Sequence, residues 1–204
     1  MDLQHLPVNW FDLTVVAFLL FGLVRGRKNG LSQELLIMLQ WVAIVCACGY
    51  GYKTVGEFMS QNTVFSLLFS YIVSYLSIAI GVSIFFSLVK RLLGGKLVGS
   101  DVFGSGEYYI GMPAGMVRFA CIAIFLLSFV GARFYSQAEI KAQAKYNTEI
   151  YGNTYWPTLP LVQDEIFRKS FTGPYIRQFL GFLLITPTPP DNKPVKTRVN
   201  TEGL

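Results

Sequence analysis

The sequence predicts an all-α fold: a polytopic integral membrane protein with four transmembrane helices and short C-terminal amphipathic helices. Apolar residues make up 52% of its 204 residues and charged residues only 14%, whereas soluble domains carry about 25% charged residues. Four apolar runs also approach the length of about 20 residues that a helix needs to cross a hydrocarbon core. Because no backbone amide can stay unpaired in lipid, these runs are predicted to be helices.

The four runs occupy the first two thirds of the chain. Residues 10–24 form the first and shortest run. It lacks the basic segment and the small-residue cleavage site of a signal peptide, so it is predicted to be a retained span. Residues 31–50 form the second run. Residues 64–89 form the third, which holds no charged side chain, and residues 110–132 form the fourth, which holds only Arg118.

The basic residues are divided among the loops, and this division sets the predicted orientation. The loop after the first run and the loop after the third run are both basic; they hold Arg25, Arg27, Lys28 and Lys90, Arg91, Lys96, respectively. The positive-inside rule places both loops in the cytoplasm, so both termini are predicted to be extracytoplasmic. A net charge of +5 that is spread over loops in this way does not indicate a nucleic-acid partner.

Residues 1–134 therefore make up the predicted transmembrane domain, and residues 135–185 a helical segment outside the cytoplasm. The polar stretch 133–151 is rich in helix-forming residues, so it either prolongs the fourth helix or forms a separate surface helix. Residues 186–204 hold four prolines and few apolar residues. They cannot bury enough surface to offset their ordering entropy, and a disordered tail is predicted from Thr186.

A short amphipathic helix is predicted before this tail. Five apolar residues follow the i, i+3, i+4, i+7, i+8 spacing of one helical face, namely Ile176, Phe179, Leu180, Leu183 and Leu184. The segment is too short to span the membrane. It either packs on the helix bundle or lies in the interfacial plane with Arg177 among the lipid headgroups.

Small residues recur at helical spacing in the predicted spans. Gly22, Gly26 and Gly30 lie four residues apart, and Gly111 and Gly115 do the same in the fourth run. Such stripes let two helix backbones approach closely in a membrane, so these glycines are predicted to serve helix packing or turns. The third run carries a stripe of Ser66, Ser70, Ser74, Ser77 and Gly81. Its hydroxyls either serve packing or line a polar pathway.

Charged residues near the predicted span ends form the main candidate site. Asp12 lies at the outer end of the first span and, with Asn9 three residues earlier, fits an N-terminal helix cap. Glu34 and Arg118 are expected at the same depth, because each lies within the first turns of its span. We predict that they form a charge cluster, with Arg25 as a third member, that ties the two helical hairpins together. Independent snorkelling of each side chain to the cytoplasm is the alternative.

The sequence gives no enzyme signal. His5 is the only histidine and precedes the first span, so one chain cannot assemble a histidine-based metal site or nucleophile. Residues 99–106 have the GxxxxG spacing of a phosphate loop without the following Lys and Ser or Thr. Asp101 and Glu107 have no neighbour that marks acid–base chemistry. The spacing of the three cysteines indicates neither a metal site nor a disulfide; they are Cys46, Cys48 and Cys121. We therefore predict no enzymatic activity, no metal and no cofactor.

The stretch from Trp10 to Trp41 resembles the opening of the colicin V production protein (CvpA) family. Members of this family begin with an aspartate-led span, then Gly-x-x-Arg-Gly, a basic turn with a glycine, a glutamate before Leu-Leu, and a tryptophan. The matching positions are Asp12, Gly22, Arg25, Gly26, Gly30, Glu34 and Trp41. A second match keeps Gly111, Gly115 and Arg118.

The second match also departs from the family pattern. Glu107 and Tyr108 replace an Asp-Arg pair, Ala114 replaces a Phe and Phe119 replaces a Gly. The resemblance covers about residues 8–135. It implies a bacterial inner-membrane protein with about four spans, linked to colicin V production or export and to envelope maintenance, with no established enzymatic activity.

The predicted function is therefore that of an accessory or scaffold protein of the bacterial inner membrane, in toxin production or export and envelope homeostasis. Its expected partners are the lipid bilayer and other membrane proteins or further copies of the chain; the sequence identifies no small-molecule substrate. The alternative is a subunit of a small oligomeric channel or transporter, which the serine stripe and the charges near the span ends would serve.

Overall fold

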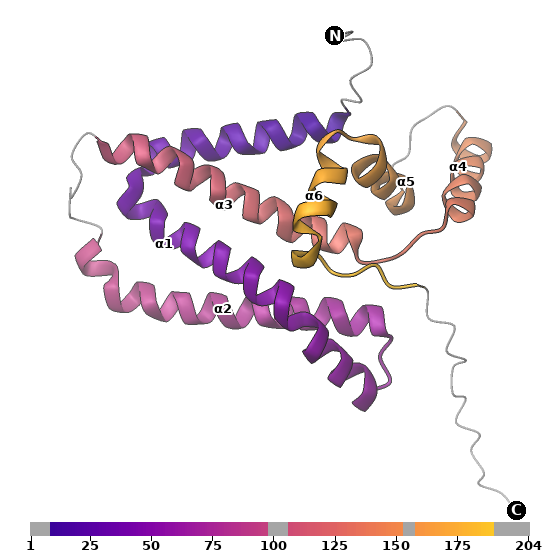
Figure 1. Ribbon diagram of the computed structural model, residues 1–204, viewed down its shortest axis with the longest axis horizontal. Helices are drawn as coiled ribbons and strands as arrows, with labels where there is room; N and C mark the ends of the chain where they lie inside the picture. The colour runs from indigo at the N-terminus through magenta and orange to yellow at the C-terminus, as the bar shows by residue number, and fades with distance from the viewer. Residues whose placement is uncertain (1–8, 98–105, 153–157, 190–204) are drawn as a thin grey trace, which may run out of the picture.

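The computed structural model describes residues 9–97, 106–152 and 158–189. Within these ranges the chain is helical, and the only β-type pairing is an isolated bridge between Arg133 and Thr188. Six α-helices follow one another (Figure 1): α1 Trp10–Asn62, α2 Leu67–Leu97, α3 Gly106–Gly131, α4 Gln137–Tyr151, α5 Leu159–Asp164 and α6 Thr172–Leu180. A π-helical turn, Glu165–Lys169, follows α5, and a 3₁₀ turn, Gly181–Leu183, follows α6.

Helix α1 contains the first two predicted runs as one 53-residue element with a bend at Gly30. Gly30 has φ 73° and ψ 168°, a backbone conformation that glycine adopts without a Cβ clash. Figure 1 shows the chain reversing its direction there, so that residues 10–29 form a first arm and residues 31–62 a second arm. Three helices, α1, α2 and α3, are long and apolar enough to cross a membrane. The predicted count of four separate spans is not confirmed.

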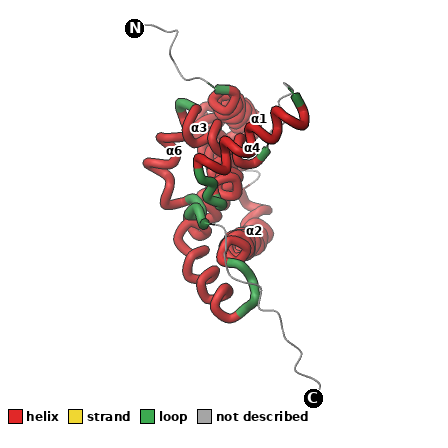
Figure 2. Tube along the Cα trace, turned by 90° about the vertical axis from the view of Figure 1, so that its right-hand side faces the viewer, coloured by secondary structure: helices red, strands yellow, loops and turns green. Residues whose placement is uncertain are grey.

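The second arm of α1 lies at the centre of the bundle. Ile44, Cys48 and Tyr52 on this arm pack against Tyr71 and Tyr75 of α2. Helix α3 packs along α1 as well, and both α2 and α3 make their main helix contacts with α1. Figure 2, seen from the side of α4 to α6, shows α2 below and the first arm with α3 above. The second arm therefore joins the two sides of the molecule.

Large apolar side chains cover the outside of the long helices. Leu13, Phe21, Ile80 and Leu92 are 70%, 55%, 59% and 83% exposed. Exposed apolar area on this scale marks a surface that meets lipid or a partner rather than water. The composition of the outer surface therefore agrees with membrane helices.

The bundle has two distinct ends. The elbow end comprises the Gly30 bend, the start of α3 and the end of α2, whereas the cap end comprises the start of α1, the end of α3 and helices α4 to α6 (Figure 1). The polar stretch after α3 forms a separate helix, α4. The sequence had left this possibility open beside a prolonged fourth helix. The N-terminus of α4 is closed by a capping box in which the Ser136 side chain accepts from the Glu139 N–H and Glu139 accepts from the Ser136 N–H.

The predicted C-terminal helix is shorter than its apolar pattern suggested. Helix α6 ends at Leu180, and Phe179, which was assigned to the apolar face, is 64% exposed. Leu183 and Leu184 are buried, but Leu183 belongs to the 3₁₀ turn and lies against Gly49 of α1. A Cβ added to Gly49 would lie 2.9 Å from Leu183 Cα, so this glycine lets the turn approach α1 closely. The segment thus packs on the bundle.

The ordered chain extends past the predicted start of the tail at Thr186. The Thr186 N–H donates to Tyr52 Oη at 2.9 Å. The Thr188 N–H donates to the Ala132 carbonyl at 3.0 Å, and the Phe134 N–H donates to the Thr188 carbonyl at 2.9 Å. Hydrogen bonds therefore hold the chain beyond the predicted start of the tail, as far as Thr188. Residues 190–204 lie outside the described part of the chain.

Candidate functional site

Four glycines bring α3 into direct backbone contact with the first arm of α1. A Cβ added to Gly26 would overlap the Gly111 carbonyl oxygen, and a Cβ added to Gly115 would overlap the Gly22 carbonyl oxygen. A Cβ on Gly22 would lie 2.8 Å from the Gly115 carbonyl oxygen. The two predicted glycine stripes therefore face each other, and the approach leaves no room for a side chain on either helix.

The bend at Gly30 is closed by a carboxylate from α3. The Ser32 N–H, an amide in the first turn of the second arm, donates to Glu107 Oε1 at 2.9 Å. A Cβ on Gly30 would lie 3.2 Å from Glu107 Cγ, so the glycine also makes room for this side chain. Glu107 is 7% exposed and caps the second arm from a different helix.

Sequence reasoning missed this role of Glu107, which it left without a partner. The contact joins residues 75 positions apart, and no local pattern reports it. One signal was present: Glu107 stands where the CvpA pattern has an aspartate. Both residue types carry a carboxylate, and the carboxylate of Glu107 accepts from the elbow amide.

Glu34 and Arg118 form a buried ion pair one turn beyond the elbow. Arg118 Nη1 lies 2.9 Å from Glu34 Oε1 and 3.1 Å from Glu34 Oε2. Asn29 Nδ2 donates to Glu34 Oε2 at 3.2 Å. The Glu34 side chain has no exposed surface, and the Arg118 side chain is 15% exposed. The pair links the second arm of α1 to α3, and Asn29 reaches it from the end of the first arm.

Arg25 does not join this pair. Its side chain is exposed, and none of the ion pairs found among the described residues includes it. The third group on Glu34 is the uncharged Asn29 instead, which sequence reasoning did not single out. A net-neutral site of one carboxylate, one guanidinium and one amide avoids burying an excess charge.

Asp12 lies at the other end of the first arm and holds two helix starts together. Asp12 Oδ2 accepts from the Asn9 N–H at 2.9 Å, which completes the capping box of α1. The same carboxylate accepts from the Phe171 N–H at 2.9 Å, the Thr172 N–H at 2.8 Å and the Thr172 hydroxyl at 2.6 Å. These are donors at the start of α6. The cap that the sequence placed on α1 therefore also anchors α6 to the bundle.

The small-residue stripe of α2 divides between two environments. Ser70 and Ser74 are buried, and their hydroxyls have no hydrogen-bond partner among the described residues. Ser77 and Gly81 lie on the exposed side of the helix. Within a single chain, the residues of the stripe therefore do not line one continuous polar surface.

The described residues contain no group of three His, Cys, Asp or Glu side chains that could hold a metal ion. Cys48 and Cys121 are buried free thiols, and Cys46 is an exposed one. Three charged groups of the elbow end are instead bound to a helix start or to an opposite charge: Glu107 accepts from the Ser32 N–H, and Glu34 pairs with Arg118. These contacts are suited to holding helices together.

Comparison with known proteins identifies the family. The model of the family described as colicin V production protein matches residues 11–151. This match starts close to the predicted one and reaches further, to the end of α4. No curated protein and no solved structure matches the chain. The matched residues make up well over half of the sequence and include the elbow, the glycine contact and the Glu34–Arg118 pair. The chain therefore belongs to the colicin V production protein (CvpA) family.

Proposed function

We propose that the chain crosses the bacterial inner membrane four times, once with each arm of α1 and once each with α2 and α3. The first arm, residues 10–29, is about 30 Å long at 1.5 Å per residue, which is the thickness of a hydrocarbon core. The basic residues of the two loops lie toward the elbow end, so this end is cytoplasmic and the cap end, with both termini, is extracytoplasmic.

The protein acts there as a non-catalytic accessory or scaffold in toxin production or export and in envelope homeostasis. The observation that supports this proposal is the buried Glu34–Arg118 ion pair. Both residues occupy family-motif positions, and the pair joins two helices. Together with the Glu107 cap, it fixes the elbow end. This end presents Arg27, Lys28, Tyr108 and Tyr109 around an open hollow, and arginine and tyrosine are enriched in protein interfaces.

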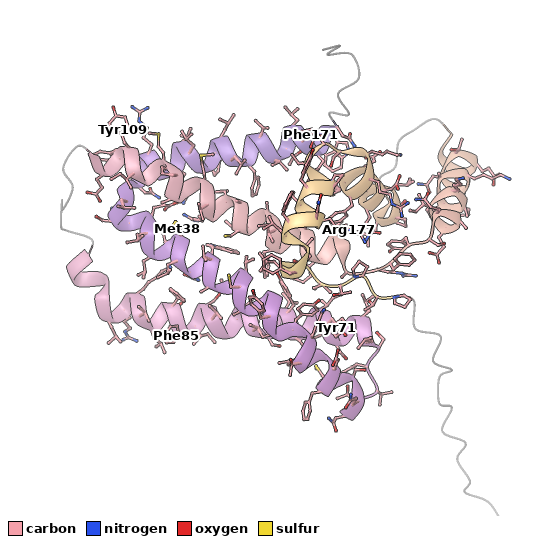
Figure 3. The ribbon with its side chains drawn as sticks, viewed as in Figure 1. Met38, Tyr71, Phe85, Tyr109, Phe171 and Arg177 are labelled. Atoms are coloured by element: carbon pink, nitrogen blue, oxygen red, sulfur yellow. The ribbon has the colours of Figure 1, made fainter. Side chains whose placement is uncertain are left out.

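In-membrane crosslinking tests the scaffold role. A photoreactive amino acid replaces Tyr109 at the elbow end, and a matched variant carries it at Phe85 on the outer face of α2 (Figure 3). The two side chains are 64% and 60% exposed, so they differ in location rather than in accessibility. In cells that secrete colicin V and lack their own copy, we expect a defined membrane-protein adduct from position 109 that is absent from position 85.

A flux measurement tests the alternative of a channel or transporter subunit. Purified chain in liposomes should give no ion or solute flux. Flux that is abolished by Ser74→Leu, together with the same adducts from both positions, would contradict the scaffold role and favour the oligomeric channel.

A further inference from the structure

A cavity of about 270 Å³ opens at the cap end, where α3 gives way to α4 and where the π-helical turn and the residues after α6 meet. It is half enclosed, and its size is close to the lower limit of small-molecule pockets. Apolar side chains form much of its wall, including Ile140, Phe167, Leu184 and Ile185. None of the contacts described above for the elbow end reaches it.

The charged groups of this cavity are mostly cationic. Arg133, Arg168 and Arg177 line it, and Asp164 is the acidic residue beside them. The Asp164 carboxylate lies 3.5 Å from Arg168 Nη1 and 3.4 Å from Lys169 Nζ, so its charge is already offset. Arg133 and Arg177 form no ion pair with any residue that the structure describes. Two guanidinium groups thus remain available to an anion.

The position of the cavity suggests which anion this is. Arg133 comes two residues after the last residue of α3, a membrane-spanning helix, and its guanidinium lies over the Tyr135 ring with 5.0 Å between Cζ and the ring centroid. Arg177, which Figure 3 marks on α6, also lines the cavity, from a different element. In a bilayer this depth is that of the headgroups, where the anions are phosphate esters attached to apolar chains.

We propose that this cavity binds a phosphate group through Arg133 and Arg177, with the apolar wall receiving the adjoining part of an amphiphile. A guanidinium binds phosphate oxygens with two parallel hydrogen bonds, and two such groups on separate elements fix the position of the anion. The phosphate belongs either to a lipid headgroup or to a soluble phosphate compound. The site is distinct from the scaffold surface at the elbow end and does not depend on it.

Lipid binding to the purified full chain tests the proposal. Native mass spectrometry in neutral detergent measures retention of phosphatidylglycerol, and titration calorimetry measures binding of inorganic phosphate. The double variant R133Q/R177Q removes both guanidinium groups. The control K141Q/K145Q removes the same charge from α4, at two exposed side chains that do not line the cavity.

A loss of phosphatidylglycerol affinity of about tenfold or more in R133Q/R177Q, against less than about threefold in the control, supports a lipid phosphate. Binding of inorganic phosphate that is lost in the same variant supports a soluble phosphate. Equal weakening in the two double variants means that the arginines act only as general surface charge and overturns the proposal. Failure of the unmodified chain to bind either probe overturns it as well.

A second variant keeps the test decisive if the glutamine variant does not fold. R133K/R177K keeps both charges, but an ammonium group cannot make the paired hydrogen bonds. It should bind the retained probe several-fold more weakly than the unmodified chain, and unchanged affinity would contradict the site. Circular dichroism and gel filtration verify that each variant keeps the helical fold.

Discussion

Glu34 and Arg118 are unequal partners, although they form one ion pair. The Glu34 carboxylate is fully buried, whereas the Arg118 side chain retains 15% exposure. Arg118 has a long side chain whose charged end can turn toward the headgroups when its partner is lost. Glu34 has no such route, because its carboxylate lies one turn from the elbow, enclosed by α3 and Asn29. Substitution of Glu34 alone and substitution of Arg118 alone should therefore lower the free energy of unfolding by different amounts.

The R118M variant should lose about 3–5 kcal/mol of unfolding free energy, because it leaves a buried carboxylate without its cation. The E34M variant should lose less. The double variant E34M/R118M should recover most of the loss, because two apolar groups of similar volume can replace a buried pair at little cost. Unfolding by a denaturing detergent, followed by circular dichroism, gives the three values. Additive losses in the double variant would contradict a coupled pair.

Asp12 should control the attachment of α6 more than the stability of the bundle. The D12A variant leaves the Phe171 and Thr172 amides without their acceptor, at a cost on the order of 2 kcal/mol. Hydrogen exchange at these two amides should accelerate, while exchange in α2 stays unchanged. The control T14A removes a nearby exposed hydroxyl that bonds only within α1, and it should leave α6 unaffected. Equal acceleration in both variants would show that Asp12 does not anchor α6.

At the scale of elements, the contact between the first arm and α3 depends on backbone proximity. Gly26 and Gly111 touch through backbone atoms, and so do Gly22 and Gly115. Lipid provides no hydrophobic force that presses helices together, so van der Waals packing of this kind and polar contacts must hold them. The Glu34–Arg118 pair joins the second arm to the same helix, α3, so the two interactions hold both arms of α1 against α3.

A methyl group at Gly26 should therefore separate the two helices. The G26A variant should lose about 1–3 kcal/mol of unfolding free energy, because the added Cβ overlaps the Gly111 carbonyl oxygen. The control G81A adds the same methyl group to α2 at a glycine with nothing within 4 Å of an added Cβ. It should gain up to about 1 kcal/mol from helix propensity. Equal effects in the two variants would mean that the glycine contact does not limit the packing.

The helical elements were predictable from the sequence to the extent that their causes are local. Apolar run length located α2 and α3 and the two arms of α1, and the polar stretch rich in helix-forming residues indicated the helix that became α4. The sequence did not show that the arms form one bent element, because the Gly30 conformation depends on the Glu107 side chain across the elbow. The contact of the turn after α6 with Gly49 is likewise non-local, because Gly49 belongs to a distant helix.

The candidate site likewise contains residues that the sequence identified and residues that it did not. Periodicity and span depth singled out the two glycine stripes and both members of the buried pair, which the structure places together. Asn29, Glu107 and the second role of Asp12 could not be predicted, because each depends on a partner that only the folded bundle brings near. Arg25 was expected in the cluster on charge alone, and its side chain is exposed instead.

At the scale of the whole molecule, the two ends differ in what they present. The elbow end carries basic side chains over closed helix contacts, and the cap end carries three short helices and the described C-terminal residues (Figure 1). A bilayer with a negative inner surface favours the orientation that places the basic end in the cytoplasm, at about 1 kcal/mol for each Lys or Arg near the surface. If each arm of α1 crosses the membrane, Lys28 and Lys145 must lie on opposite sides.

Cysteine accessibility tests this arrangement in intact cells. In a chain whose three native cysteines are replaced by alanine, the K145C variant should react with a membrane-impermeant maleimide that has passed the outer membrane, because Lys145 is 81% exposed on α4. The K28C variant should react only after the inner membrane is opened, since its position borders the elbow, which the proposed orientation places in the cytoplasm. Labelling of both variants in intact cells would mean that the arms of α1 do not cross. Labelling of the K28C variant alone would mean that the bundle is inverted and that the basic residues do not determine its orientation.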